Sequence, residues 1–192
     1  MKKDQVAVTK LLGVWISEDL SWSKNTQEIT RKCFARLSLL TKLKYVGVGI
    51  EDLLDIYVLF IRSCAEYCCV AFQSRLTAEQ SDSLERVQKV SLKDILGDNF
   101  IGYSEALEMT GLSTVFHRRE DRCLSFSLKC LKHPIHKKLF PLNPVLHDDD
   151  NEEYLRDREL FKVNHAHTET YRQSTIPYCQ RLLNKHYSTK TK

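Results

Sequence analysis

One apolar stretch, Leu53–Phe72, constrains the fold more than any other part of this sequence. Sixteen of its twenty residues are apolar, and it has neither glycine nor proline, so nothing within it stops a helix. Its length would suit a membrane span. However, it carries Asp55, Arg62 and Glu66, and each such charge costs roughly 2.5–3.5 kcal/mol near a bilayer centre. We therefore predict a buried bundle helix over about residues 51–73.

Apolar residues at helical spacing predict further helices on both sides of this stretch. The expected ranges are 24–45, 77–96, 103–110 and 114–132, with a short last helix at 177–186. Thr77 with Gln80 has the pattern of a capping box, as does Asn25 with Glu28, for which Ser23 is an alternative cap. Ser113 is the expected cap of the helix at 114–132.

The N-terminal segment is the one region with a strand pattern. Val6 and Val8 alternate with polar residues, and Leu11–Ile16 is rich in β-branched and aromatic side chains. A single strand or hairpin buries itself poorly, so it needs a partner within this chain or outside it. The expected fold is therefore mostly α: a helical bundle preceded by a short β-strand or hairpin.

The character of the sequence changes after Pro134. Pro134, Pro141 and Pro144 lie within eleven residues, and an acidic block occupies 148–153. Helical periodicity is lost, which predicts an extended C-terminal arm with long loops. The expected regions are a strand segment at 1–23, a bundle at 24–133 and a tail at 134–192.

Cysteine usage indicates a reducing compartment. Seven cysteines are an odd number, and Cys68 and Cys69 are adjacent within the apolar stretch, a pattern typical of free thiols. We expect Cys64, Cys68 and Cys69 to be buried and unpaired. The N-terminus has lysines but no apolar segment, so a secretory signal is not expected. The predicted localisation is nuclear or cytoplasmic, with no membrane partner.

Candidate metal and catalytic residues are few. Cys123, Cys130, His133 and His136 could suggest zinc, but the spacing C-x6-C-x2-H-x2-H matches no common zinc module. Packing thiols and solvated histidines are the favoured interpretation. A glycine-rich phosphate loop and a nucleophile elbow are both missing from the sequence. We therefore predict no catalytic residue, no metal and no cofactor.

Basic helix faces indicate a function more strongly than the candidate metal and catalytic residues do. Residues 113–140 contain seven Lys and Arg against two acids, and residues 24–44 contain six against one. Cations repeated along a helix face can follow the phosphates of a nucleic-acid backbone, although most charged helix faces are simply solvated. The candidate nucleic-acid-binding residues are Arg31, Lys42, Arg86, Lys89, Lys93, Arg118, Arg122 and Lys129.

Several short motifs occur in a family-like order. Lys10–Ile16 followed by Leu20-Ser21-Trp22 resembles the K-x-L-G-V-x-I…L-x-W segment that closes the palm in reverse transcriptases of jockey-like non-LTR retrotransposons. The central stretch is similar to that family's Y-x-x-F-I-R-x-x-x-E-Y segment, through Tyr57, Phe60, Ile61, Arg62, Glu66 and Tyr67. Further matches include Glu85–Lys89, Tyr103–Leu107, Arg118-Arg119 and Tyr171–Ser174, so the resemblance runs from about residue 9 to 186.

The resemblance implies the palm-end strand, thumb and C-terminal tail of an RNA-directed DNA polymerase of a transposable element. The family's catalytic palm lies upstream, and its pair of metal-binding aspartates has no counterpart here, so no polymerase activity is expected from this chain alone. The implied role is weak, salt-sensitive binding of a template–primer duplex, such as an RNA–DNA hybrid, through phosphate contacts of the eight cations. The missing palm and fingers, or another protein, are further implied partners.

Two departures from the family pattern favour an alternative. The family commonly has a proline before the Glu-Tyr pair, where this chain has Ser63-Cys64-Ala65, and its third helix is richer in arginine than Val90–Asp94. Both changes fit a decaying or domesticated fragment. The alternative is a helical protein-interaction module or an inactive domesticated remnant, because exposed apolar surface near an unpaired strand favours protein association.

Overall fold

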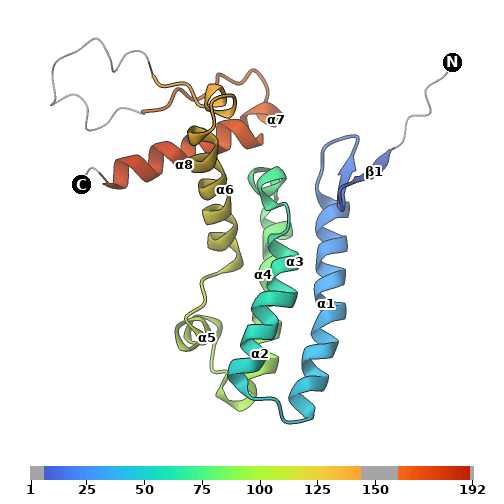
Figure 1. The fold of residues 1–192 in the computed structure, drawn as a ribbon. Coiled ribbons are helices and arrows are strands. Elements are labelled where there is room, and N and C mark those ends of the chain that lie inside the picture. Colours follow the sequence, from blue (N-terminus) through green and yellow to red (C-terminus); the bar gives the residue numbers. More distant parts are fainter. Residues whose placement is uncertain (1–6, 144–159, 191–192) are drawn as a thin grey trace. The chain divides into compact units, whose positions relative to one another are not determined.

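The computed structural model describes residues 7–143 and 160–190 (Figure 1). The fold class predicted from the sequence is confirmed: the described residues are mostly helical and begin with a short antiparallel hairpin. Two compact units are present. Unit 1 contains the residues up to Cys69 together with Leu76–Arg119, and unit 2 contains Val70–Arg75 and the residues from Glu120 onwards. The part of the predicted arm that contains the acidic block at 148–153 lies outside the described residues.

The division into units differs from the three regions expected from the sequence. The hairpin belongs to the same unit as the helical bundle, and the boundary near Arg119 falls inside a helix instead of at Pro134. Composition changes at the prolines, but compactness depends on which side chains pack together, so the two criteria divide the chain at different places.

The hairpin of unit 1 consists of β1 (Val8–Leu11) and β2 (Val14–Ser17), with Leu11 opposite Val14. Its two turn residues, Leu12 and Gly13, have φ of 47° and 86°, as required in the tightest hairpin turns. The backbone N–H of Trp15 donates to Asn25 Oδ1 at 3.1 Å, which attaches the hairpin to the following helix.

Helix α1 (Ser23–Tyr45) buries the predicted apolar face, including Ile29, Cys33, Leu37 and Leu40. The predicted capping box of Asn25 and Glu28 is wrong. The helix begins earlier, at Ser23, and Asn25 accepts from the hairpin instead, while Glu28 pairs with Lys24 and Arg31. A contact with a neighbouring element therefore replaces the local cap.

The central helix is not continuous over residues 51–73 as predicted. It consists of α2 (Ile50–Ile56), a π-helical segment η1 (Tyr57–Arg62) and α3 (Ser63–Glu66). Cys68 has φ of 56°, and only the short 3₁₀ turns η2 (Cys69–Ala71) and η3 (Gln73–Arg75) follow. The apolar residues Leu53, Tyr57, Ile61 and Ala65 of the helical part are buried.

The end of the central helix also changes the environment of its thiols. Cys69 is buried as predicted and Cys64 is half-buried, but Cys68 is exposed, so its predicted burial is wrong. The chain leaves the helix at this residue, and the side chain consequently points to solvent. All seven cysteines lie within the described residues, and none of them forms a disulfide, as expected.

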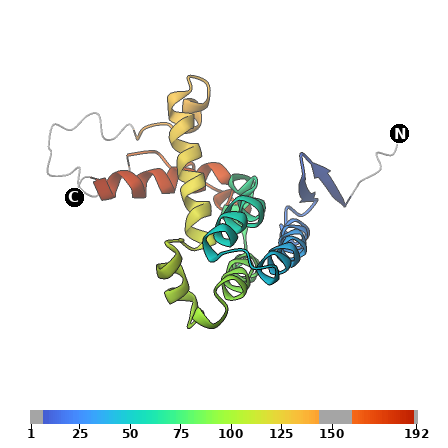
Figure 2. The same cartoon turned by 60° about the horizontal axis from the view of Figure 1, so that its bottom comes forward.

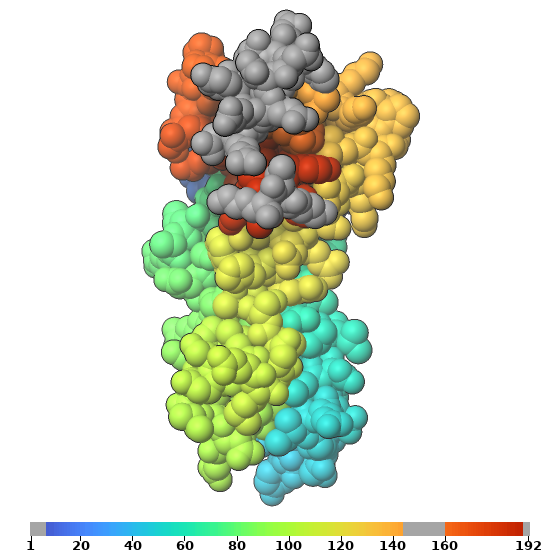
Figure 3. All heavy atoms as spheres, turned by 90° about the vertical axis from the view of Figure 1, so that its left-hand side faces the viewer, coloured from blue at the N-terminus to red at the C-terminus, as the bar shows by residue number. Residues whose placement is uncertain are grey.

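Helix α4 (Ala78–Leu96) lies beside α1 and the α2–α3 segment (Figures 1 and 2). Both halves of the predicted Thr77–Gln80 capping box form. The helix is followed by a short 3₁₀ turn, η4 (Gly97–Asn99), and by α5 (Tyr103–Thr110). Ala106 of α5 joins Leu92 and Leu96 in a buried cluster to which Leu54 of α2 also packs, and Figure 3 shows α5 and α2 side by side.

Helix α6 (Val115–Lys132) matches its predicted range, but its cap differs. The expected cap was Ser113, whereas the hydroxyl of Thr114 accepts from His117 N at 3.2 Å. Unit 1 contributes the start of this helix, up to Arg119, and unit 2 contains the rest.

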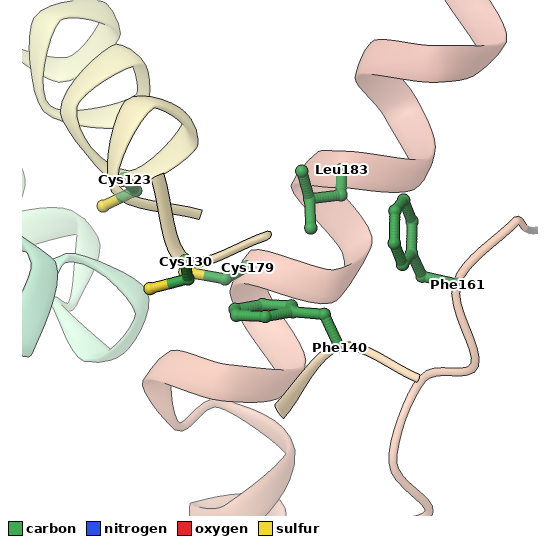
Figure 4. Close-up of a cluster of buried hydrophobic side chains, with 6 residues drawn as sticks. All are labelled: Cys123, Cys130, Phe140, Phe161, Cys179 and Leu183. Atoms are coloured by element: carbon green, nitrogen blue, oxygen red, sulfur yellow. The ribbon is translucent and has the colours of Figure 1, made fainter. Parts of the chain in front are cut away.

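Unit 2 has a core of its own around α8 (Thr175–Lys190), which is longer than the predicted 177–186. It also contains the 3₁₀ turn η5 (His136–Leu139) and the short helix α7 (Glu169–Arg172). Side chains from α6, α8 and the connecting segments meet in the core (Figure 4): Cys123, Cys130, Phe140, Phe161, Cys179 and Leu183.

Two buried amide side chains of α8 hold the connecting segments in place. Asn184 bonds both the N–H and the carbonyl of Phe161, at 2.7 and 2.9 Å. Gln180 accepts from Asn164 N and donates to the carbonyl of Leu139. Part of the predicted extended arm is therefore held against α8. Within the described ranges, no helix is long and apolar enough to cross a membrane.

Candidate nucleic-acid interface

Three of the eight predicted cations lie on the outer face of α4. Arg86, Lys89 and Lys93 are exposed and follow one another at steps of three and four residues. They line a groove of about 520 Å³ together with Asp82, Glu85, Val90 and Tyr103. The opposite face of α4 is buried in the bundle, so the three cations can face solvent while the helix itself is fixed. We call Arg86, Lys89 and Lys93 the α4 cation row.

A polar network lies beneath this groove. The carboxylate of Glu85 accepts from the backbone N–H of Val115 at 3.1 Å and of Phe116 at 3.0 Å, and the hydroxyl of Tyr103 also donates to it. Val115 and Phe116 are the first residues of α6, where the helix dipole favours a negative charge. Glu85 therefore caps α6 from a neighbouring helix, and its charge offsets the α4 cation row less than an uncommitted carboxylate would.

Gln88 extends the network into the core. Its Oε1 accepts from the hydroxyl of Tyr57 at 2.8 Å, and its Nε2 donates to the Tyr103 hydroxyl and to the Ser113 carbonyl, both at 3.0 Å. Burial raises the pKa of both tyrosines, and the hydrogen bond to Glu85 raises the pKa of Tyr103 further. The wall of the groove is thus tied to η1, α5 and the start of α6.

The sequence interpretation did not assign a role to Glu85 or Gln88. A signal was present, because Gln88 occurs among the buried apolar positions Leu84, Val87, Leu92 and Ile95 of α4. A polar residue on the buried face of a helix requires hydrogen-bond partners. The partners themselves come from distant parts of the chain and were not predictable from local spacing.

The two predicted cations of α1 lie on its outer face. Arg31 and Lys42 are both exposed. The guanidinium of Arg31 bonds Glu28 Oε2 at 2.9 Å, and Lys24 Nζ lies 3.1 Å from Glu28 Oε1. These hydrogen bonds hold the pKa of Glu28 below its usual range. The positive charge of Arg31 is therefore partly offset by Glu28. Lys42 lies in the last turn of α1, where it is exposed to solvent.

The three predicted cations of α6 do not have equivalent environments. Arg118 is only partly exposed, and its Nε donates to Glu66 Oε1 at 3.2 Å, where Arg62 also contacts the same oxygen at 3.4 Å. Arg118 therefore takes part in an internal ion-pair cluster of unit 1. Arg122 and Lys129 are exposed and belong to unit 2.

The residues considered for zinc also differ in their surroundings. Cys123 and Cys130 are buried in the core of unit 2. His133 and His136 are exposed, and their rings stack on each other with centroids 4.2 Å apart. In the part of the chain that the structure describes, no group of three or more His, Cys, Asp or Glu side chains could hold a metal ion.

No protein-family model, curated protein or solved structure matches this chain. The relation to retrotransposon reverse transcriptases is therefore a proposal that depends on the motif order in the sequence.

Proposed function

We propose that this chain is the palm-end hairpin, thumb and C-terminal tail of a non-LTR retrotransposon reverse transcriptase, and that it binds a template–primer duplex without polymerase activity of its own. The observation that supports binding most directly is the α4 cation row, which is exposed and lines one groove. Its contacts would be to phosphates, so binding would depend little on base sequence.

The spacing of the row is compatible with a nucleic-acid backbone. Arg86 and Lys93 are seven residues apart, which on an α-helix corresponds to roughly 10 Å. The phosphates of one strand rise about 3.4 Å each along a duplex, so the row spans about three nucleotides. Three phosphate contacts without base readout favour weak and strongly salt-dependent affinity.

A labelled RNA–DNA hybrid titrated with the full chain at low salt tests this proposal. We expect a dissociation constant in the micromolar range or weaker, rising steeply with salt. The triple variant Arg86→Glu/Lys89→Glu/Lys93→Glu should weaken binding at least about tenfold, and a milder Lys-to-Gln series should lower the salt slope by about one per contact.

The matched control reverses three exposed cations of unit 2, Lys137→Glu/Lys138→Glu/Lys185→Glu, with the same change in net charge. It should bind much more tightly than the α4 variant. An equal loss of hybrid affinity in both variants would show that only net charge matters, and would reject the α4 cation row as the binding site. Absence of any binding at about 50 µM protein at low salt would reject the function itself.

A second candidate function, a protein-association module, is supported by a different observation. Leu11 and Leu12 at the hairpin turn are 59% and 81% exposed. Exposed apolar side chains beside a strand edge favour association with another protein or a second copy. Size-exclusion chromatography with light scattering separates the two functions. A salt-insensitive oligomer that ignores the hybrid favours association, and a monomer that binds the hybrid favours the thumb.

A further inference from the structure

A second cavity lies where α1 and α4 begin. It measures about 650 Å³ and is lined by residues from the first eight positions of α1, by the cap residue Thr77 and by residues from the first six positions of α4, among them Lys24, Thr26, Thr30, Glu79 and Gln80. The side-chain amide of Gln80 donates to Ser23 Oγ at 3.0 Å, which ties the two helix starts together. The positive ends of two helix dipoles therefore meet at one polar cavity.

The two helix starts differ in their capping. Thr77 caps α4 through a complete capping box. At the start of α1, in contrast, no side chain of the described residues accepts a hydrogen bond at the N-cap position, which Trp22 occupies. In the first turn of α1, the N–H of Thr26 donates to the Trp22 carbonyl at 2.8 Å, and the N-cap side chain accepts from none of the N–H groups that precede Thr26.

Two buried hydroxyl groups provide an independent indication of a ligand. Thr26 is only 3% exposed, and its Oγ1 has no hydrogen-bond partner in the described part of the chain. Oγ1 of Thr30, a half-buried residue one turn further along α1, likewise has no hydrogen-bond partner there. Both residues line the cavity. Buried polar groups normally have partners, so two such hydroxyls at one cavity point to an acceptor that binds there.

The chemistry of the lining selects the kind of ligand. Hydroxyls, amides and the helix N-termini offer mainly donors, and Glu79 is the one acid among the lining residues. The Lys24 ammonium also belongs to the lining, and its Nζ lies 3.1 Å from Glu28 Oε1, which offsets part of its charge. Such an arrangement suits a phosphoryl group. We propose that this cavity binds a phosphoryl group, supplied either by the backbone of a nucleic acid or by free phosphate.

The nucleic-acid source rests on the proposed function. Ser83 of the cavity is three residues from Arg86, the first cation of the α4 cation row, so both lie within one turn of α4. A backbone phosphate in the cavity would therefore extend the series of phosphate contacts towards the start of the helix. Free phosphate would bind in the same place without the row.

Inorganic phosphate is the probe for the cavity. The full chain is titrated with sodium phosphate against sodium chloride at constant ionic strength, while the backbone amides of Ser23–Thr26 and Ala78–Gln80 are followed by NMR. We expect saturable shifts of these amides and a rise in the melting temperature with phosphate, because a ligand that binds only the native state stabilises it.

Two variants should shift the phosphate affinity in opposite directions. Thr26→Val removes one donor and should weaken phosphate binding about fivefold, while leaving the phosphate-free protein folded because the lost hydroxyl had no partner. Glu79→Gln removes the opposing negative charge and should tighten binding about threefold. Ser38→Ala, at an exposed position of α1 outside the cavity, is the matched control and should behave as the wild type.

Phosphate binding at the cavity and hybrid binding by the thumb can be distinguished by measuring both. Phosphate shifts without hybrid binding would support the cavity with free phosphate as its source, and reject the thumb function. Hybrid binding weakened by Thr26→Val, together with phosphate shifts, would identify a backbone phosphate. Absence of saturable shifts at about 50 mM phosphate, or an unchanged affinity in Thr26→Val, would overturn the cavity proposal and leave hybrid binding unaffected.

Discussion

Glu66 contacts two arginine side chains through a single carboxylate oxygen. Its Oε1 lies 3.4 Å from Arg62 Nε and 3.2 Å from Arg118 Nε. The side chains of Arg62 and Glu66 are only 10% and 7% exposed, whereas that of Arg118 is 32% exposed. In an isolated helix, an arginine that precedes its glutamate is the weaker order. Here the two side chains are buried, so each charge needs its partner for the fold to remain stable, because a buried charge without a counter-charge is costly.

Removal of the Glu66 charge is therefore expected to destabilise unit 1 strongly. Glu66→Gln should lower the free energy of unfolding by about 3 kcal/mol, because Arg62 would be left buried without a counter-charge. Urea unfolding followed by circular dichroism measures the change. Glu51→Gln, at an exposed residue of α2, is the control and should change stability by less than about 0.5 kcal/mol.

The double variant Arg62→Met/Glu66→Leu tests whether the pair itself stabilises the fold. We expect it to be much closer to wild type than Glu66→Gln, since both buried charges are replaced together and Arg118 can reach solvent. A double variant as unstable as Glu66→Gln would show that the cluster contributes net stability. The same contact explains why reversal of the charge of Arg118 would report on folding as well as on binding.

At the scale of elements, the π-helical segment Tyr57–Arg62 decides which side chains of the central helix face the core. Ile61 and Arg62 are consecutive, yet both are buried. In a regular α-helix, consecutive residues point about 100° apart, whereas a π-helical turn accommodates an extra residue in one turn. The wider turn allows an apolar contact and an ion pair to be made side by side from the same helix.

The hairpin turn provides a prediction at this scale. Leu12 adopts φ of 47° and is highly exposed, a combination that asparagine tolerates far better than leucine. Leu12→Asn places Asn-Gly at the turn and should raise the free energy of unfolding by about 0.5–1 kcal/mol. Thermal and urea unfolding provide the measurement.

Leu12→Val is the matched control for this substitution. Valine is β-branched and fits a positive φ poorly, so it should destabilise the hairpin. If both substitutions changed stability in the same direction, loss of the leucine side chain, and not the backbone conformation, would explain the effect.

At the scale of the whole molecule, each unit has its own core and its own set of polar contacts. In unit 1, Tyr57, Gln88, Tyr103 and Glu85 connect η1, α4, α5 and the start of α6. In unit 2, Gln180 and Asn184 hold the connecting segments against α8. Buried polar networks of this kind stabilise one arrangement of elements, because every alternative leaves polar groups unpaired.

The tyrosines of unit 1 predict a loss of stability at alkaline pH. Burial raises the pKa of Tyr57 and Tyr103 above that of tyrosine in an unfolded chain, about 10. The native state consequently retains protons that the unfolded state releases, so stability is complete below about pH 10 and falls as the pH rises above it. Urea midpoints measured between pH 8 and about 11 should show this decrease.

Two phenylalanine variants isolate the contribution of the network. Tyr103→Phe should lower stability at pH 8, because Gln88 and Glu85 each lose a partner, and should show a smaller further loss at alkaline pH than wild type. Tyr45→Phe, at a residue that is 92% exposed, should keep the full pH dependence. Identical alkaline profiles for all three proteins would contradict this explanation.

Local patterns were sufficient to predict several elements of the fold. The spacing of Ile29, Cys33, Leu37 and Leu40 predicted the buried face of α1, and the Thr77–Gln80 capping box predicted where α4 begins. The α4 cation row faces outward because its residues alternate, at helical spacing, with the buried residues of α4. These features depend on neighbours within a few residues along one helix, which is the range over which sequence periodicity carries information.

Contacts between distant residues decided the remaining features. Glu66 and Arg118 are 52 residues apart, and Glu85 and Val115 are 30 apart, so no local pattern could assign Arg118 to an ion pair or Glu85 to the cap of α6. The end of the central helix before Cys68 likewise has no glycine or proline to mark it. The sequence by itself determined the helices and their apolar faces, because those follow from local geometry. Only the tertiary structure decided which charges are free to bind a ligand, because burial and ion pairing arise only when separate elements pack.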